Sequence, residues 1–232
     1  MQITKYNQSC LLVETNDKRI LIDPSNIDYT DVMYNKEWVN IDAILITHKH
    51  QDHCYGEIIK KIIERDNCRV YTSTEVDKYN HFDNTIIVKE NDIIEIFPNI
   101  KIEITHAEHG YLTGMRESNN EIIENIGFII DDGKIRLYTT SDTINFYNDY
   151  KCDILCMPFN GNGLTFGIID GINFAKQINP KLLLPIHMQH PKGIMNPNID
   201  KLKQELEHNC INYKIMKIGE KINFNDEKII EA

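Results

Sequence analysis

The sequence predicts an α+β fold in which two β-sheets pack on each other with helices on the outside. The order of the elements supports this, because a strand-rich half and a helix are followed by a second strand-rich half and another helix. A chain of 232 residues is long enough to bury a core without disulfides. It contains no repeat, low-complexity stretch or linker-like segment, so we expect one domain over residues 1–232.

The first half of the chain contains short apolar runs typical of strands and one helical pattern. A polar turn at residues 15–18 joins two such runs, which indicates a β-hairpin. Four isoleucines fall on one face of a predicted helix over residues 57–65. The strands expected in this half are residues 10–14, 19–23, 41–47, 68–72, 85–88, 93–96 and 100–105.

The second half also contains several strand-like runs, together with two helical patterns. The dipeptide Asp132-Gly133 lies between two apolar runs and is typical of a hairpin turn. We expect helices over residues 166–178 and 199–207, the latter after an asparagine N-cap. Residues 107–125 show little periodicity and predict a long surface loop. The strands expected here are residues 126–131, 134–139, 153–157, 182–186, 213–218 and 221–224.

Composition and charge argue against several functions. The 25 basic and 35 acidic side chains give a net charge of −10, which disfavours nucleic-acid binding because such binding depends on Lys and Arg. No apolar run approaches the ~18 residues of a membrane span, and the first residues lack the apolar core of a secretory signal. The six cysteines are scattered without a C-x-x-C pair. We therefore expect reduced thiols, a cytoplasmic location and no membrane contact.

The stretch THKHQDHCYG, directly after a predicted buried strand, carries the strongest chemical signal. His48 and His50 are two residues apart in an extended segment, so both rings can point the same way. Asp52 and His53 are adjacent and must diverge, which suits a second centre. Imidazole and carboxylate together suit zinc, iron or manganese rather than calcium or magnesium. The pattern therefore predicts a metal site.

Four ligands cannot complete two metal sites, so further ligands must come from later in the chain. The candidates each follow a short apolar run and can lie at the same edge of the sheets. They are His106, His109, Asp142, His187 and His190. His81 and His208 do not follow such a run, and we expect both at the surface.

The motif H-x-H-x-D-H formed by His48, His50, Asp52 and His53 resembles the signature of the metallo-β-lactamase superfamily. The resemblance covers nearly the whole chain. It implies the αβ/βα four-layer sandwich of that fold, with a dinuclear metal site at one edge. Since ligands then come from both halves of the chain, the resemblance also favours a single domain.

The resemblance implies a role for each ligand. His48, His50 and a later histidine would form site one, whereas Asp52, His53 and a C-terminal histidine would form site two, with an aspartate bridging them. The later positions that match are His109, Asp142 and His187, and His106 is an alternative to His109 as the third ligand of site one. Asp23, in the stretch ILIDP, resembles a buried aspartate that supports the ligands from behind.

The activity implied is hydrolysis that depends on two divalent ions, with zinc favoured and manganese or iron as alternatives. A water bridging the metals would become a hydroxide that attacks a lactone or a phosphoester, and Asp52 would both bind metal and orient this nucleophile. The compact length, the P-x-H sequence at His187 and the glycine-bearing stretch 158–163 resemble the L-ascorbate-6-phosphate lactonase-like branch.

We expect a small-molecule substrate that carries an anionic group. His190 and Lys192 follow the ligand His187 and, with Asn160, are candidate substrate contacts. Two other functions fit the same ligands: a nuclease-type phosphodiesterase, which the net charge disfavours, and a non-catalytic protein that binds or senses metal. A diiron flavoprotein is disfavoured because that type has Glu at the position of His50. The sequence carries no signal of oligomeric state.

Overall fold

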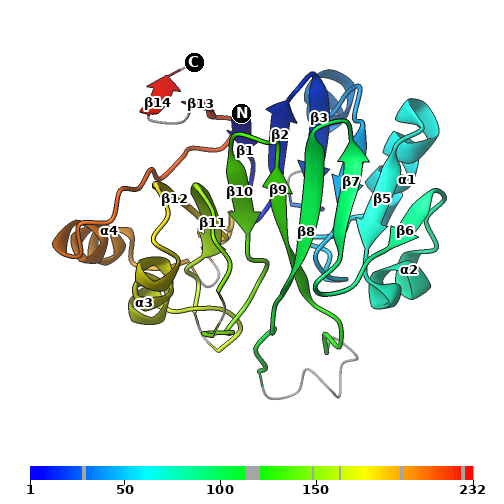
Figure 1. Ribbon diagram of the computed structural model, residues 1–232. Coiled ribbons are helices and arrows are strands. Elements are labelled where there is room, and N and C mark those ends of the chain that lie inside the picture. The colour runs from blue at the N-terminus through cyan, green and yellow to red at the C-terminus, as the bar shows by residue number, and fades with distance from the viewer. Residues whose placement is uncertain are drawn as a thin grey trace. The chain divides into compact units, whose positions relative to one another are not determined.

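Two mixed β-sheets organise the computed structural model of the protein, and each sheet belongs to a different compact unit of the chain (Figure 1). The first unit comprises residues 1–89 and 217–232, and the second comprises residues 90–216. The structure describes residues 1–27, 30–112, 121–147, 149–161, 163–193, 196–225 and 228–231. The prediction of two sheets is confirmed, and residues 113–120 of the predicted loop 107–125 lie outside the described residues.

The sheet of the first unit has the strand order β14-β13-β1-β2-β3-β4-β5-β6. Strands β1, β2 and β3 are antiparallel neighbours, which confirms the predicted hairpin, whereas β3 to β6 run parallel. The carboxyl ends of β3, β4 and β5 therefore lie at one edge. The strands are β1 Gln2–Lys5, β2 Leu11–Thr15, β3 Lys18–Ile22, β4 Ala43–Leu45, β5 Arg69–Thr72, β6 Thr85–Ile87, β13 Lys221–Asn225 and β14 Lys228–Glu231.

Helix α1, Gly56–Asp66, covers this sheet with the isoleucine face that the sequence predicts. Ile58, Ile59, Ile62 and Ile63 are all buried and belong to one apolar cluster. The same cluster contains Trp38, whose ring meets that of Tyr6 edge to face at 5.7 Å. Each buried aliphatic side chain contributes about 1.5–3 kcal/mol, so this face fixes α1 on the sheet.

The predicted strand 41–47 is shorter than expected, because side chains take the hydrogen bonds at both of its ends. Strand β4 covers only Ala43–Leu45. The Ile41 amide donates to the Asp66 carboxylate at 2.9 Å, and the Thr47 amide donates to Asp23 Oδ1 at 2.8 Å. These two contacts replace hydrogen bonds of the sheet and leave the chain after Leu45 as a loop.

Two helical segments of the first unit lack a long periodic pattern and were not predicted. Helix α2, Thr74–Asn80, has seven residues and is capped by the Ser73 hydroxyl, which accepts from the Val76 amide at 3.4 Å. A π-helical turn, Met33–Glu37, buries none of its side chains. Neither segment is long enough for an apolar face to be seen in the sequence.

The sheet of the second unit has the order β12-β11-β10-β9-β8-β7. Strands β10, β11 and β12 are parallel, and β8 runs in the same direction as β10 because both are antiparallel to β9. The carboxyl ends of β8, β10, β11 and β12 therefore lie at one edge. The strands are β7 Ile93–Phe97, β8 Ile100–His106, β9 Ile126–Asp131, β10 Arg136–Thr139, β11 Ile154–Pro158 and β12 Leu182–Ile186.

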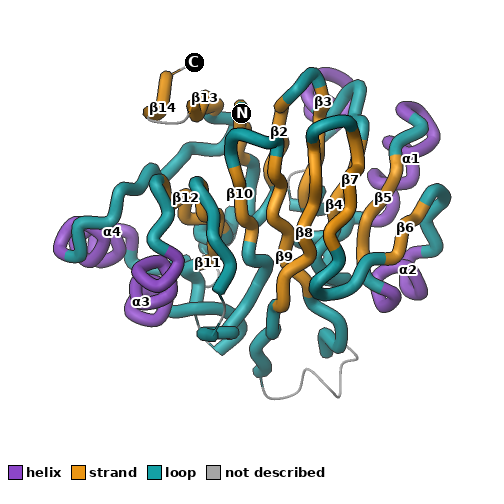
Figure 2. The backbone as a smooth tube through the Cα atoms, viewed as in Figure 1, coloured by secondary structure: helices purple, strands orange, loops and turns teal. Residues whose placement is uncertain are grey.

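Helix α3, Ile168–Ile178, packs against β11 and against helix α4, Ile199–His208 (Figure 2). Both helices lie close to their predicted positions. Asn198 caps α4 as expected, since its side chain accepts from the Lys201 amide at 3.0 Å. Asn179 ends α3 in the left-handed conformation, φ +54°.

The predicted strand 213–218 is wrong. Only Tyr213 forms a bridge, to Leu183 of β12. The residues on either side of Tyr213 make its hydrogen bonds: the Asn212 carbonyl accepts from the Leu183 amide, and the Lys214 amide donates to the Leu183 carbonyl. Beyond it, the Met216 carbonyl accepts from the Gln189 side chain at 3.2 Å instead of from a strand. The alternation of apolar residues therefore reflects one-sided packing of an irregular segment.

None of the described helices combines the length and the apolar composition needed to cross a bilayer. None of the six cysteines forms a disulfide, and Cys10, Cys54, Cys68 and Cys156 are buried. Cys210 is exposed. Burial raises the pKa of the Cys68 and Cys152 thiols to about 12.

Thiol labelling checks this arrangement. At pH 8 a thiol with a pKa of 12 is ionised in only about one molecule in ten thousand, and the thiolate is the reactive form. We expect Ellman's reagent to modify Cys210 rapidly in the folded protein and the other five cysteines only after unfolding in guanidinium. Rapid reaction of more than one thiol in the folded state would contradict the burial described.

Candidate metal centre

The loop between β4 and α1 carries the first group of predicted ligands. It follows the carboxyl end of a parallel strand, the usual place for a binding site in such a sheet. His48 and His53 are buried, whereas His50 and Asp52 are partly exposed. The amides of His53 and Cys54 both donate to the His50 carbonyl, which folds the loop into a tight turn.

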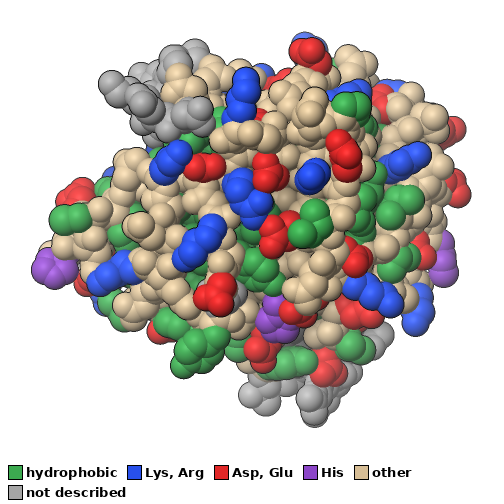
Figure 3. Space-filling model, viewed as in Figure 1, with side chains coloured by type: hydrophobic (Ala, Val, Ile, Leu, Met, Phe, Trp, Pro, Cys, Tyr) green, Lys and Arg blue, Asp and Glu red, His purple; other side chains and the backbone are tan. Residues whose placement is uncertain are grey.

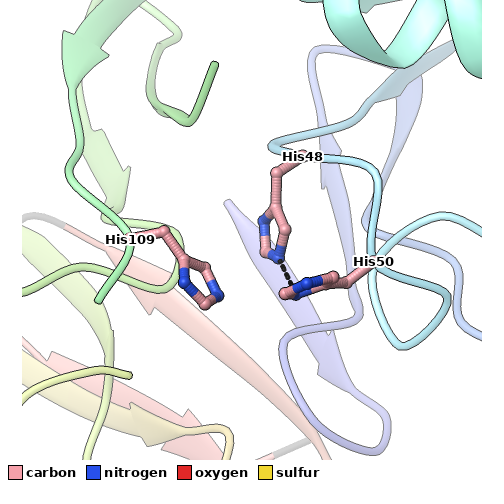
Figure 4. Close-up of side chains that lie close together, drawn as sticks. All are labelled: His48, His50 and His109. Atoms are coloured by element: carbon pink, nitrogen blue, oxygen red, sulfur yellow. Dashed lines mark hydrogen bonds between the residues drawn. The ribbon is translucent and has the colours of Figure 1, made fainter. Parts of the chain in front are cut away.

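His48 and His50 present ring nitrogens to each other. Their Nε2 and Nδ1 atoms lie 3.1 Å apart, and the rings meet edge to face (Figure 4). Two ligands at about 2.1 Å from a tetrahedral zinc ion lie about 3.4 Å from each other. The observed spacing therefore suits two ligands of one ion.

The other two members of the motif extend this group. Ligand atoms of His48 and His53 lie within 4.8 Å of each other, and so do those of Asp52 and His53. The rings of His48 and His53 have their centroids 4.1 Å apart. The motif is thus a compact set of three imidazoles and one carboxylate, the donors preferred by zinc and similar ions.

Asp23, at the end of β3, lies behind these ligands. Its buried carboxylate accepts hydrogen bonds of 2.8 Å each from the Thr47 amide, the Thr47 hydroxyl and His53 Nδ1. Burial raises the pKa of Asp23, and the bonds from His53 and Thr47 oppose that shift. Because His53 donates through Nδ1, its lone pair is on Nε2, the atom that a metal requires.

Asp142 and His187 form the second pair of predicted ligands, in the second unit. Asp142 follows β10, His187 follows β12, and both side chains are buried. His187 Nε2 lies 3.2 Å from Asp142 Oδ2. This separation also matches that of two ligands on one ion.

His109 lies in the loop after β8, with its ring buried. Its Nδ1 hydrogen-bonds the Gly110 carbonyl at 2.7 Å, which places the ring proton on Nδ1 and the lone pair on Nε2. The loop is joined to that of Asp142, because the Ile144 amide donates to the Glu108 carbonyl at 2.8 Å. His109 and Asp142 therefore lie on loops that are fastened to each other.

Gly110 is required by this arrangement of loops. A Cβ atom at this position would lie 1.7 Å from the Gly163 carbonyl oxygen, too close for any side chain. The Gly110 amide donates to the Leu164 carbonyl at 2.9 Å. The glycine thus holds the segment of His109 against the loop that follows β11.

His106, the alternative ligand, lies elsewhere in the second unit. It is the last residue of β8 and is exposed, since side chains alternate along a strand and Thr105 points inward. Its Nδ1 lies 2.9 Å from the Glu90 carboxylate, and its amide donates to the Tyr150 hydroxyl. The two candidate histidines therefore differ sharply in burial and in partner.

The three predicted substrate contacts also have defined places. Asn160 is buried, and its Nδ2 lies 2.9 Å from His187 Nδ1. His190 is partly exposed and Lys192 is exposed, and the Lys192 amide donates to His190 Nδ1 at 3.2 Å. His81 and His208 are exposed, as predicted.

Several residues that support the ligands were not predicted. Asn125 binds the loop of Asp142, since its Nδ2 donates to the Asp142 carbonyl at 2.7 Å and its Oδ1 accepts from the Ser141 hydroxyl at 2.6 Å. Ser141 adopts φ +63°, which costs a residue other than glycine free energy that this hydrogen bond helps to offset. Sequence offers no signal for such contacts, because Asn125 and Ser141 are distant in the chain.

Comparison with solved structures identifies the class of fold. The chain aligns with the metallo hydrolase Igni18 of Ignicoccus hospitalis at a TM-score of 0.79 and 22% identity, over 97% of this chain and 98% of that one. It aligns with the metallo-beta-lactamase fold protein YhfI of Bacillus subtilis at a TM-score of 0.73 and 15% identity, over 95% and 98% of the two chains. The predicted α+β sandwich of the metallo-β-lactamase fold is confirmed.

Comparison of sequences identifies the family. Residues 2–187 match the family described as "Beta-lactamase superfamily domain", and the chain belongs to that superfamily. It is 27% identical over 196 residues to a "UPF0173 metal-dependent hydrolase" of Methanosarcina mazei, an alignment that covers 81% of this chain and 83% of that protein. A metal-dependent hydrolase of this fold is also the class of enzyme that the sequence predicts.

The Asp23 network predicts a large effect of one buried substitution. Asp23→Ala leaves the Thr47 and His53 donors buried without their acceptor, so we expect the free energy of unfolding to fall by about 3–5 kcal/mol. Asp23→Asn keeps one acceptor oxygen and should lose less. Urea denaturation of the metal-free protein measures both.

Asp200→Ala, in the exposed first turn of α4, is the control, and it should change the free energy of unfolding by less than about 1 kcal/mol. If Asp23→Ala were as stable as this control, the network would not anchor the ligand loop.

Proposed function

We propose that this hydrolase cleaves a lactone or a phosphoester of small size, using two divalent ions held jointly by residues of both units. One ion would be held by His48, His50 and His109, and the other by Asp52, His53 and His187, with Asp142 bridging the two. Joint ligation would make the two units one functional domain over residues 1–232.

The observation that carries the proposal is the spacing of paired ligand atoms in each unit. The separations of 3.1 Å for His48–His50 and 3.2 Å for Asp142–His187 are those expected around a single ion. His48 and His50 follow the parallel strand β4, whereas Asp142 and His187 follow the parallel strands β10 and β12. The donor set of imidazoles and carboxylates favours zinc, with manganese or iron as alternatives.

The hydrogen bonds behind the ligands support the same conclusion. His53 and His109 both place a proton on Nδ1, through the Asp23 carboxylate and the Gly110 carbonyl, so that Nε2 is available to a metal. His109 is therefore preferred over His106, whose ring is exposed and paired with Glu90.

Divalent ions, when bound, supply a hydroxide nucleophile at neutral pH and stabilise the negative charge that develops on the substrate oxygen. The partly exposed Asp52 carboxylate would orient the nucleophile by accepting its proton in a hydrogen bond. His190 and Lys192 lie on the turn after His187, and their side chains would bind an anionic group of the substrate.

The preference for a small anionic substrate agrees with the charge of the protein. Basic and acidic side chains are intermixed on the face shown in Figure 3, so that face has no basic stripe for a nucleic-acid backbone. We favour the lactonase-like branch over a nuclease-type phosphodiesterase for this reason and because the net charge is −10. Six cysteines without a disulfide support a reducing compartment such as the cytoplasm.

Metal content of ligand variants is the first test. We expect protein purified without chelators to contain two divalent ions per chain by elemental analysis, with zinc the most abundant. His48→Ala and His187→Ala remove one ligand from each proposed site, so each should lose at least one ion.

The exposed histidines provide matched controls, because His81→Ala and His208→Ala are the same substitution away from the proposed ligands. Both should keep the full metal content. Unchanged metal content in His48→Ala and His187→Ala would contradict the assignment of the ligands.

Turnover is the second test. We expect the metal-loaded enzyme to hydrolyse members of a panel of lactones and small phosphoesters, and Lys192→Ala to raise KM for anionic substrates while leaving KM for neutral lactones unchanged. Bound metal with no turnover on any substrate would favour the metal-sensing alternative. Preferential cleavage of RNA or DNA would favour the nuclease alternative.

A further inference from the structure

We propose that Asn160 is a positioning residue for His187, and that Thr165 in turn fixes the Asn160 amide. The inference rests on the proposed function, because it takes His187 to be a metal ligand. It gives Asn160 a different role from the substrate contact that the sequence predicts.

The sheet brings Asn160 next to His187. Strands β11 and β12 are parallel neighbours in which Pro158 pairs with Ile186, the last residue of each strand. His187 directly follows β12, and Asn160 lies two residues beyond the end of β11. Their side chains meet at 2.9 Å, between Asn160 Nδ2 and His187 Nδ1.

Thr165 holds the other end of the same amide. Its hydroxyl donates to Asn160 Oδ1 and accepts from the Gly161 amide at 3.2 Å. Asn160 and Thr165 are both buried. Both polar atoms of the Asn160 side chain are therefore engaged within the protein, and a substrate would have to break these bonds to use them.

The direction of the His187 ring depends on its side-chain torsions as well as on its backbone. The residue has φ +52°, the left-handed region that a residue with a side chain seldom adopts. The ring must keep Nε2 toward Asp142 Oδ2, 3.2 Å away. A hydrogen bond at Nδ1, on the opposite side of the ring, sets that direction.

The Asn160 amide can serve His187 with or without a metal. A histidine that binds metal through Nε2 carries its proton on Nδ1 and therefore requires an acceptor there. An amide offers an oxygen after rotation by half a turn, and the Thr165 hydroxyl can accept from the nitrogen as readily as it donates to the oxygen. His187, Asn160 and Thr165 can therefore stay hydrogen-bonded to one another when His187 binds a metal through Nε2.

Zinc affinity tests the proposal. In a competition with a chromogenic chelator, we expect Asn160→Ala to bind zinc about 10–100-fold more weakly than the wild type. Asn160→Asp keeps an acceptor for Nδ1–H and should restore affinity to within a few-fold. Thr165→Val retains the shape but loses the hydroxyl, so its loss should be smaller than that of Asn160→Ala.

Nuclear magnetic resonance gives a readout that a merely structural role would not move. In the zinc-loaded protein labelled with ¹⁵N-histidine, the Nδ1–H of His187 should give a signal protected from exchange with water. We expect this signal in the wild type and in Asn160→Asp and its loss in Asn160→Ala. Asn209→Ala is the matched control, because the Asn209 side chain bonds the Glu205 carbonyl at 2.8 Å and the Lys176 ammonium at 3.2 Å, and neither group contacts His187 or Asn160.

The outcomes separate this proposal from the proposed function. If His187→Ala keeps its metal, the ligand assignment fails and this inference fails with it. If His187→Ala loses metal while Asn160→Ala retains wild-type zinc affinity and the protected signal, only the present inference is overturned. A higher KM in Asn160→Ala with unchanged zinc affinity would likewise overturn it, since that result indicates a substrate contact.

Discussion

The buried Asp23 carboxylate accepts three hydrogen bonds from Thr47 and His53, and the loop that carries the first group of predicted ligands depends on this interaction. A charge taken out of water is costly unless each of its oxygens has a partner. That requirement ties the end of β3 to the loop after β4, ends β4 at Leu45 and orients His53. These hydrogen bonds hold in place the loop that carries His48, His50, Asp52 and His53.

In the second unit, neutral backbone and amide groups provide the hydrogen-bond partners of the predicted ligands. The Gly110 carbonyl accepts from the His109 ring, the Asn125 amide donates to the Asp142 carbonyl, and the Asn160 amide bonds the His187 ring. Gly110 and Asn125 lie at the two ends of the segment between β8 and β9, whereas Asn160 lies in the loop after β11. Two backbone hydrogen bonds, from Ile144 to Glu108 and from Gly110 to Leu164, join the loops that follow β8, β10 and β11.

Patterns along the chain were sufficient to locate most of the elements and to single out the candidate ligands, whose role stays a prediction. The isoleucine face of α1, the hairpin at Asp132-Gly133 and the cap at Asn198 each follow from local chemistry, and all are present. The segment 213–218 alternates like a strand, but its backbone groups bond a side chain and a single bridge partner, which local pattern does not reveal.

The supporting residues were the least predictable part of the candidate site. Asn160 was predicted near the site, but its contact with His187 depends on the pairing of β11 with β12. Thr47 stands out only as a neighbour of the motif, and Asn125 is not part of any motif. Their importance arises from three-dimensional placement, since each satisfies a buried group that belongs to another segment.

The central claim is that ligands from both units share the same metal ions. Anomalous diffraction at the zinc edge from crystals of the zinc-loaded protein tests it most directly. Two anomalous peaks are predicted, each contacted by ligands from the 48–53 loop and by at least one of His109, Asp142 and His187. Peaks whose ligands all come from one unit, or peaks located only at other histidines such as His81 and His208, would contradict the claim.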